Sequence, residues 1–98
     1  MAQVRFSVEA ETDIDEIAAF SARTFGWRQA DIYLRRLEEC LELLAENPSV
    51  GRECAWVKAG MRRFEIGRHT IFYLPEPKGI LIARILHQQM LPTNYLQM

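Results

Sequence analysis

The sequence has little of several features that would assign it quickly to a class of protein. Its two cysteines, Cys40 and Cys54, are too few for a disulfide framework and do not have the spacing of a metal site. No stretch approaches the roughly 18 apolar residues that a membrane-spanning helix needs. The N-terminus also lacks the charged and then apolar pattern of a signal peptide, so we expect a cytoplasmic protein.

Motifs of common enzyme classes are absent as well. The chain has no glycine-rich phosphate loop, no clustered cysteines and histidines, and no G-x-S-x-G nucleophile elbow. The sequence therefore argues against nucleotide-dependent enzymes, zinc enzymes and serine hydrolases.

A net excess of charge is also missing, because 12 Lys and Arg residues face 13 Asp and Glu residues. A protein that grips nucleic acid along its whole surface normally carries a basic excess, so this balance argues against such a binder. The two halves nevertheless differ, since residues 1–50 carry a formal charge of −5 and residues 51–98 carry +4. This asymmetry indicates either a partner surface on one side or only the preference of helices for glutamate.

What the sequence does have is the size and composition of one folded unit. Its 98 residues are 49% hydrophobic and 26% charged, which is typical of a globular protein. We predict a single domain over residues 1–98. Residues 88–98 form a C-terminal tail rich in apolar side chains, and we expect this tail to pack on the domain or on a partner.

The first half of the chain predicts a strand followed by two helices. Apolar residues alternate with polar ones over 4–8, as in a half-buried strand. Thr12 or Asp13 is then expected to cap a first helix, which ends at Gly26. The connection at Gly26 is short, so the second helix should fold back as an antiparallel hairpin.

The second helix shows the clearest periodicity in the sequence. Apolar side chains recur every three or four residues from Ala30 to Leu44, and charged residues occupy the opposite side. Asn47 and Pro48 should end the helix, because proline cannot continue the hydrogen-bond ladder.

The second half of the chain predicts a three-stranded meander. Residues 55–57 suggest a short extended piece, and strands are expected at 62–66, 70–74 and 80–87. Gly67-Arg68 suits a type II′ hairpin, and residues 75–79 form a turn cluster. The fold class is therefore α+β, with a helical hairpin on one face of an antiparallel sheet to which the first strand is added.

One set of residues could carry chemistry. Cleavage of RNA needs a base, an acid and cations on the phosphate, which His87, Tyr95, Arg62 and Arg84 would supply. Arg84 interrupts an apolar strand, so it must be paired or lie at an edge. A structural ion pair with Glu65 and a phosphate-binding role are the two alternatives for Arg84. Regular alternation along the strand would place Arg84 and His87 on opposite faces.

Two aromatic side chains are candidates for contact with a partner. Trp27 and Trp56 lie beside glycine-containing or irregular segments, where they serve either as core residues or as exposed anchors.

Taken together, five segments of this sequence resemble the ParE toxins of the RelE/ParE superfamily. They are FGWRQA at 25–30, NP at 47–48 with GR at 51–52, GMRRF at 60–64, HTIFY at 69–73 and ILIARILH at 80–87. The likeness covers nearly the whole chain in order.

The resemblance implies the toxin of a bacterial type II toxin–antitoxin pair. Such a toxin inhibits DNA gyrase, and a ParD-like antitoxin binds and neutralises it in a hetero-oligomer. It implies no cofactor, no metal, no catalytic centre and no sequence-specific nucleic acid. We expect the partner contacts to include Trp27, Tyr33, Trp56 and Leu91.

Two alternatives remain open at this point. The RelE branch of the same superfamily cleaves mRNA on the ribosome, and its functional residues would fall here near Arg62, Arg84, His87 and Tyr95. This chain departs from that branch because it has only two lysines and an acidic second helix. The other alternative is an interaction domain without toxicity.

Overall fold

The first and last strands of the chain are neighbours in one mixed sheet. A computed structural model describes residues 2–96, and these form five strands and three α-helices. The elements are β1 (Gln3–Phe6), α1 (Val8–Phe25), α2 (Trp27–Glu46), the 3-10 turn η1 (Pro48–Val50), β2 (Arg52–Glu53), β3 (Arg62–Ile66), β4 (His69–Glu76), β5 (Gly79–His87) and α3 (Pro92–Tyr95). The strand order is β1-β5-β4-β3-β2.

Strand directions follow from the connections between the strands. The meander of β3, β4 and β5 is antiparallel, as predicted, and Gly67 at its first turn has φ +56°. β1 pairs in parallel with β5, and the long connection between them contains both helices and the other three strands. The predicted α+β class and meander are confirmed, but the sheet has a fifth strand and is mixed rather than purely antiparallel.

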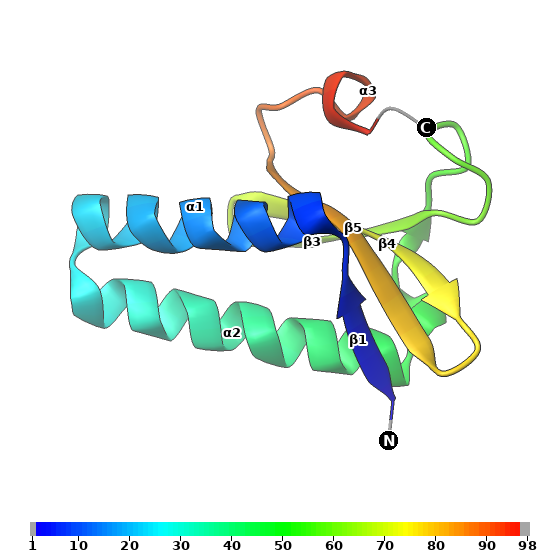
Figure 1. Cartoon of the computed structure of the whole chain (residues 1–98), viewed down its shortest axis with the longest axis horizontal. Helices are drawn as coiled ribbons and strands as arrows, with labels where there is room; N and C mark the ends of the chain where they lie inside the picture. Colours follow the sequence, from blue (N-terminus) through cyan, green and yellow to red (C-terminus); the bar gives the residue numbers. More distant parts are fainter. Residues whose placement is uncertain (1, 97–98) are drawn as a thin grey trace.

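The two long helices form the predicted antiparallel hairpin. They lie side by side and meet at Gly26, and their connected ends project away from the sheet (Figure 1). Gly26 has φ +87°, which a residue without a Cβ adopts easily, and it ends α1 and begins α2 at once. Asn47 follows the last residue of α2, and Pro48 opens η1.

The start of α1 differs from the prediction. The cap is Ser7, whose Oγ accepts a hydrogen bond from the amide of Ala10 at 3.0 Å. The helix therefore begins at Val8, one turn before Thr12 or Asp13, and Val8 does not belong to β1. Asp13 is instead an interior residue of α1, and its side chain is buried.

Three segments of the second half also differ from expectation. Residues 55–57 form turns, and the short strand lies earlier, at Arg52–Glu53. Pro75 and Glu76 continue β4, so the turn before β5 is only two residues long. β5 contains an irregularity in register, because Tyr73 is paired with Ile82 while Phe72 is paired with Arg84. The expected regular alternation along β5 is therefore wrong.

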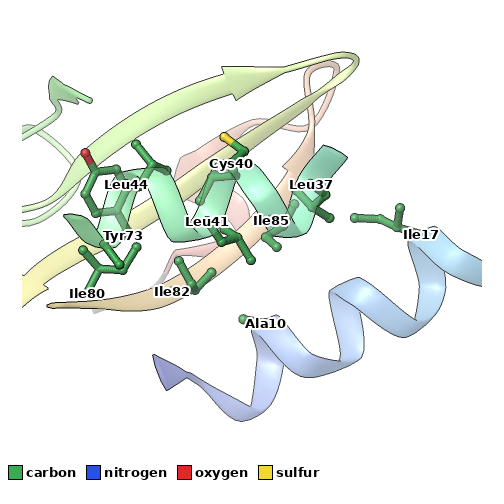
Figure 2. Close-up of a cluster of buried hydrophobic side chains, with 12 residues drawn as sticks. Ala10, Ile17, Leu37, Cys40, Leu41, Leu44, Tyr73, Ile80, Ile82 and Ile85 are labelled. Carbon is green, nitrogen blue, oxygen red and sulfur yellow. The ribbon is translucent and has the colours of Figure 1, made fainter. Parts of the chain in front are cut away.

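The larger hydrophobic core lies between the helical hairpin and the sheet. Figure 2 shows Leu37, Leu41 and Leu44 of α2 pointing toward the isoleucines of β5. Ile80, Ile82 and Ile85 are all at most 3% exposed, and the bulge is what returns Ile85 to this face. The helices cover this face of the sheet, as predicted.

A smaller core covers the opposite face of the sheet. Phe72 and Leu86 pack there with Cys54 and Met61, which flank the loop after β2. Leu96 completes this cluster and is 6% exposed, so the tail packs on its own domain. Residues 97–98 of the predicted tail lie outside the described residues. In Figure 1, α3 lies apart from the helical hairpin, close to the loop that follows β2.

Candidate functional site

Arg84 is fixed by a carboxylate of α1. Its Nε and Nη2 atoms donate to Oδ2 and Oδ1 of Asp13 at 2.8 and 2.9 Å, in the two-pronged geometry that guanidinium and carboxylate favour. Asp13 Oδ2 also accepts from the amide of Ile85, which has no strand partner on that side because β1 ends opposite Ile82. The hydrogen bonds from Arg84 to Asp13 raise the pKa of the guanidinium, which therefore stays charged.

The same arginine holds the C-terminal tail. Its Nη1 donates to the carbonyl oxygen of Tyr95 at 2.9 Å, and the guanidinium lies 5.7 Å from the centre of the Tyr95 ring. The expected ion pair between Arg84 and Glu65 is wrong, because Glu65 pairs with Arg52 instead. Arg84 thus links α1, β5 and the tail.

His87 lies at the end of β5 in a row of polar rings. Its ring meets that of His69 edge-on at 5.6 Å between centroids, and the Tyr33 hydroxyl lies 2.6 Å from His69 Nδ1. Burial, followed by the charge of His87, lowers the pKa of His69, so His69 is neutral at pH 7. Burial also raises the pKa of the Tyr33 hydroxyl. His69 and Tyr33 are therefore neutral hydrogen-bonding groups within this row.

A hollow opens beside this row, which we call the α1–β5 hollow. Its α1 side is formed by Asp13, Glu16, Ile17 and Phe20, and its strand side by His69, Ile85, His87 and Met90. Most of this lining is apolar, and Phe20 remains 54% exposed at its edge.

Arg62 lies on β3, away from the α1–β5 hollow, and stabilises a neighbouring loop. Its Nη1 donates to the carbonyl oxygen of Gly51 at 2.6 Å and to that of Ser49 at 3.3 Å. The Tyr73 hydroxyl fastens the same loop, because it donates to the carbonyl oxygen of Pro48 at 2.6 Å and accepts from the amide of Gly51 at 2.9 Å. Arg62 borders a second hollow, with Glu53 and Pro75, which shares no lining residue with the α1–β5 hollow.

The four residues of the ribonuclease alternative are therefore only partly brought together. Arg84 and Tyr95 are in contact, and His87 follows Arg84 on the same strand. Arg62 faces η1 from β3 and borders a different hollow. Asp13 compensates the charge of Arg84, so the guanidinium attracts a phosphate less strongly than an unpaired arginine would.

The four expected partner contacts differ in accessibility. Trp27, Trp56 and Leu91 are 82%, 63% and 63% exposed, as docking side chains must be. Tyr33 is half-buried, and its hydroxyl is bonded within the domain to the carbonyl oxygen of Ile66 and to His69. Tyr33 is therefore less available to a partner than the other three residues.

Sequence reasoning missed Asp13 and Phe20 as parts of a site. Asp13 was expected to be a capping residue, and Phe20 was not singled out as a contact residue. A signal for Asp13 was present, because it recurs with Ile17 and Ser21 on the apolar side of α1, where a carboxylate requires a partner. Phe20 lies one position off that stripe and has no comparable signal.

The described residues give little support for a metal site or for a reactive cysteine. Residues 2–96 contain no group of three or more histidine, cysteine or acidic side chains arranged to hold a metal ion. Cys40 and Cys54 are free and buried, and burial raises the pKa of both thiols, which makes them poor nucleophiles. None of the helices described is long and apolar enough to cross a membrane.

Comparison with known proteins decides the family. The model of the ParE toxin of the type II toxin–antitoxin system parDE matches residues 4–92. The chain belongs to this ParE toxin family. Toxin ParE1 of Caulobacter vibrioides is 37% identical over 90 residues, which cover 92% of this chain and 93% of the relative.

Other relatives of this ParE-family chain agree. Toxin ParE1 of Mycobacterium tuberculosis H37Rv is 35% identical over 86% of this chain and 87% of its own length. A solved structure from the chromosomal ParDE TA system of P. aeruginosa superposes with a TM-score of 0.73 at 20% identity, over 89% of this chain and 96% of that one. This likeness confirms the fold, and the family match confirms a ParE-type toxin of a type II toxin–antitoxin system.

Proposed function

We propose that this chain inhibits DNA gyrase by binding to it, without a catalytic centre of its own, and that a ParD-like antitoxin neutralises it. The support is membership of the ParE toxin family over residues 4–92, together with the fold shared with a chain of a ParDE system. The partners are proteins, so the expected assembly is a hetero-oligomer of toxin and antitoxin.

The observation that carries the non-catalytic mode of action is the internal use of the basic residues. Arg84 is bonded to Asp13 and to Tyr95, and Arg62 is bonded to the carbonyl oxygens of η1 and Gly51. Catalysis of RNA cleavage requires cations directed at the phosphate where charge develops. In this fold both guanidinium groups are directed at the protein itself.

Exposed apolar side chains supply a surface on which a protein partner can dock. Trp27 stands at the projecting end of the helical hairpin and Trp56 lies in the loop after β2, while Leu91 precedes α3. Large aromatic residues of this kind are typical anchors of protein interfaces. We expect the partner contacts to use these residues.

The proposal is tested by a supercoiling assay with purified gyrase and relaxed plasmid. Increasing amounts of the chain are expected to inhibit supercoiling, and prior incubation with the antitoxin encoded beside it should restore activity. Normal supercoiling in the presence of a large excess of folded chain would rule out gyrase as the target.

One observation keeps the ribonuclease alternative in view, namely the contact between Arg84 and Tyr95. That alternative predicts cleaved transcripts after expression in cells, with cleavage lost in His87→Ala. Intact mRNA accompanied by a DNA-damage response would exclude it. A growth assay with inducible expression separates both toxin mechanisms from a non-toxic interaction domain.

A further inference from the structure

The α1–β5 hollow combines apolar walls with an exposed aromatic edge. Ile17 and Ile85 are buried at its base, and Met90 is half-buried at its side. Ile17 lies at the margin of the main core, away from β1 (Figure 2). Phe20, one turn of α1 further on, leaves more than half of its surface open. An apolar side chain from another protein would find contact on several sides here.

The α1 side of this hollow is acidic. Glu16 lies one helical turn before Phe20, and Glu9 precedes Asp13 by one turn. Among the described residues, neither glutamate forms an ion pair within 4 Å, whereas Asp13 is paired with Arg84. Glu9 and Glu16 are close enough to Arg84 for their charges to contribute to the raised pKa of its guanidinium. Three carboxylates therefore surround one cation, so the rim keeps a negative charge.

On the strand side of the hollow, His69 does not cancel this charge. His69 is half-buried, and the Tyr33 hydroxyl lies within hydrogen-bond distance of its imidazole. Because its pKa is lowered, His69 adds no positive charge at neutral pH. The hollow thus offers an apolar base with a negative edge.

We propose that the α1–β5 hollow receives an apolar side chain of the antitoxin, and that a lysine or arginine of the same antitoxin segment lies along Phe20 and faces Glu16. This inference rests on the proposed function, which supplies the antitoxin as partner. Long basic side chains pack their methylene groups on apolar surface while their charged ends reach an acid, which suits the Phe20 and Glu16 pair. Opposite charges at the edge of an interface mainly direct association and register, while the apolar anchor supplies most of the affinity.

The test measures binding of the antitoxin encoded beside this chain to purified toxin variants. Phe20→Ala is expected to weaken binding about 10-fold or more, because it removes the open wall of the hollow. Glu16→Lys is expected to weaken it several-fold at low salt and less at high salt, because an exposed charge pair is screened. Both residues are exposed, so the variants should fold, which thermal unfolding verifies.

Matched controls lie on α2, outside the hollow. Leu43 is 52% exposed and Glu39 is exposed, so Leu43→Ala removes a large exposed apolar side chain and Glu39→Lys makes the same charge reversal elsewhere on the helical hairpin. We expect less than a twofold change in affinity for either control. Equal losses at Leu43 and Phe20, or unchanged binding in both hollow variants, would overturn the assignment. Loss of gyrase inhibition with unchanged antitoxin binding would also overturn it, since the hollow would then contact the target.

A failure of the proposed function gives a different result. If the wild-type chain itself binds no antitoxin, the proposed toxin–antitoxin partnership fails, and the assignment of the hollow fails with it. If the wild type binds and the hollow variants bind equally well, only the assignment of the hollow is wrong.

Discussion

Asp13 and Arg84 are 71 positions apart in the sequence and form a two-pronged ion pair that joins α1 to β5. The side chain of Asp13 is 7% exposed and that of Arg84 is 18% exposed. The carboxylate also accepts a hydrogen bond from the amide of Ile85. One side chain therefore pairs with the charge of Arg84 and with a backbone amide that has no strand partner. This pair fastens α1 to β5, and the same arginine bonds the carbonyl oxygen of Tyr95 in the tail.

Replacing Asp13 by Asn is expected to lower the free energy of unfolding by about 3 kcal/mol, because it leaves the partly buried charge of Arg84 without its counter-charge. Urea denaturation at pH 7 measures this loss. Asp31→Asn is the control, since Asp31 and Arg35 form an exposed pair on α2 whose loss should cost at most about 0.5 kcal/mol. Equal effects of the two substitutions would contradict the structural importance of Asp13.

Arg84→Lys should loosen the tail while keeping the positive charge. A lysine cannot reach Asp13 and the Tyr95 carbonyl oxygen together with the planar fork that arginine uses. Amide hydrogen exchange at Leu96, whose amide bonds to the carbonyl oxygen of Pro92, should accelerate about 10-fold, corresponding to about 1.4 kcal/mol. Exchange in the middle of α2 serves as the internal reference. Unchanged protection at Leu96 would mean that its burial alone holds the tail.

Tyr73→Phe should destabilise the protein by about 1–3 kcal/mol, because the amide of Gly51 and the carbonyl oxygen of Pro48 both lose the hydroxyl. The Tyr73 ring is fully buried, so its packing is retained in the variant. Tyr95→Phe removes a hydroxyl from a residue that is 40% exposed and should change the unfolding free energy by less than about 0.5 kcal/mol. Thermal unfolding monitored by circular dichroism compares the two variants.

Stability should fall as the pH is lowered through the range in which His69 titrates. Its pKa is lower in the folded protein than the value of about 6.5 expected for an unfolded chain, so protons bind preferentially to the unfolded state. The full stability is present above about pH 7 and declines below about pH 6.5. Melting temperatures between pH 7.5 and 5.5 measure this decline, and His69→Gln should make it shallower. A variant with the wild-type pH dependence would show that groups other than His69 dominate the change.

Trp27→Ala and Trp56→Ala should separate binding from stability. Both indoles are largely exposed, so we expect changes in unfolding free energy below about 0.5 kcal/mol. If these residues anchor a partner, each substitution should weaken binding of gyrase or of the antitoxin about 10-fold or more. Surface-immobilised toxin titrated with each partner gives both affinities. Wild-type affinity for both partners would remove these residues from the predicted contacts.

The sequence predicts well those parts of the fold whose signals are local. The apolar stripe of α2, the proline that follows it and the glycine at residue 67 each determine their own surroundings, and the structure has α2, its end and the hairpin where they were expected. Ser7 shows the limit of such signals, because Thr12 and Asp13 offer equally good local caps. Burial of Asp13 against β5 decides between these candidates, and that contact is not local.

The candidate site depends on long-range geometry. The bulge in β5 places Arg84 opposite Phe72 and returns Ile85 to the helices, which a strictly alternating pattern does not predict. The pairing of β1 with β5 is likewise set by the path of the whole chain. For these reasons the sequence singled out Arg84, His87 and Tyr95 but did not predict the contacts that Arg84 makes with Asp13 and with the tail.

The parallel pairing of β1 with β5 has a consequence for synthesis of the toxin. Residues 3–6 are synthesised before both long helices, yet their sheet partner, residues 79–82, follows only after both helices and β4. During synthesis the helical hairpin is therefore complete before the strand on which it packs, and Asp13 has no ion-pair partner until Arg84 has been made. A product that stops before β5 would lack the strand that joins β1 to the rest of the sheet, so it could not form the fold of the toxin.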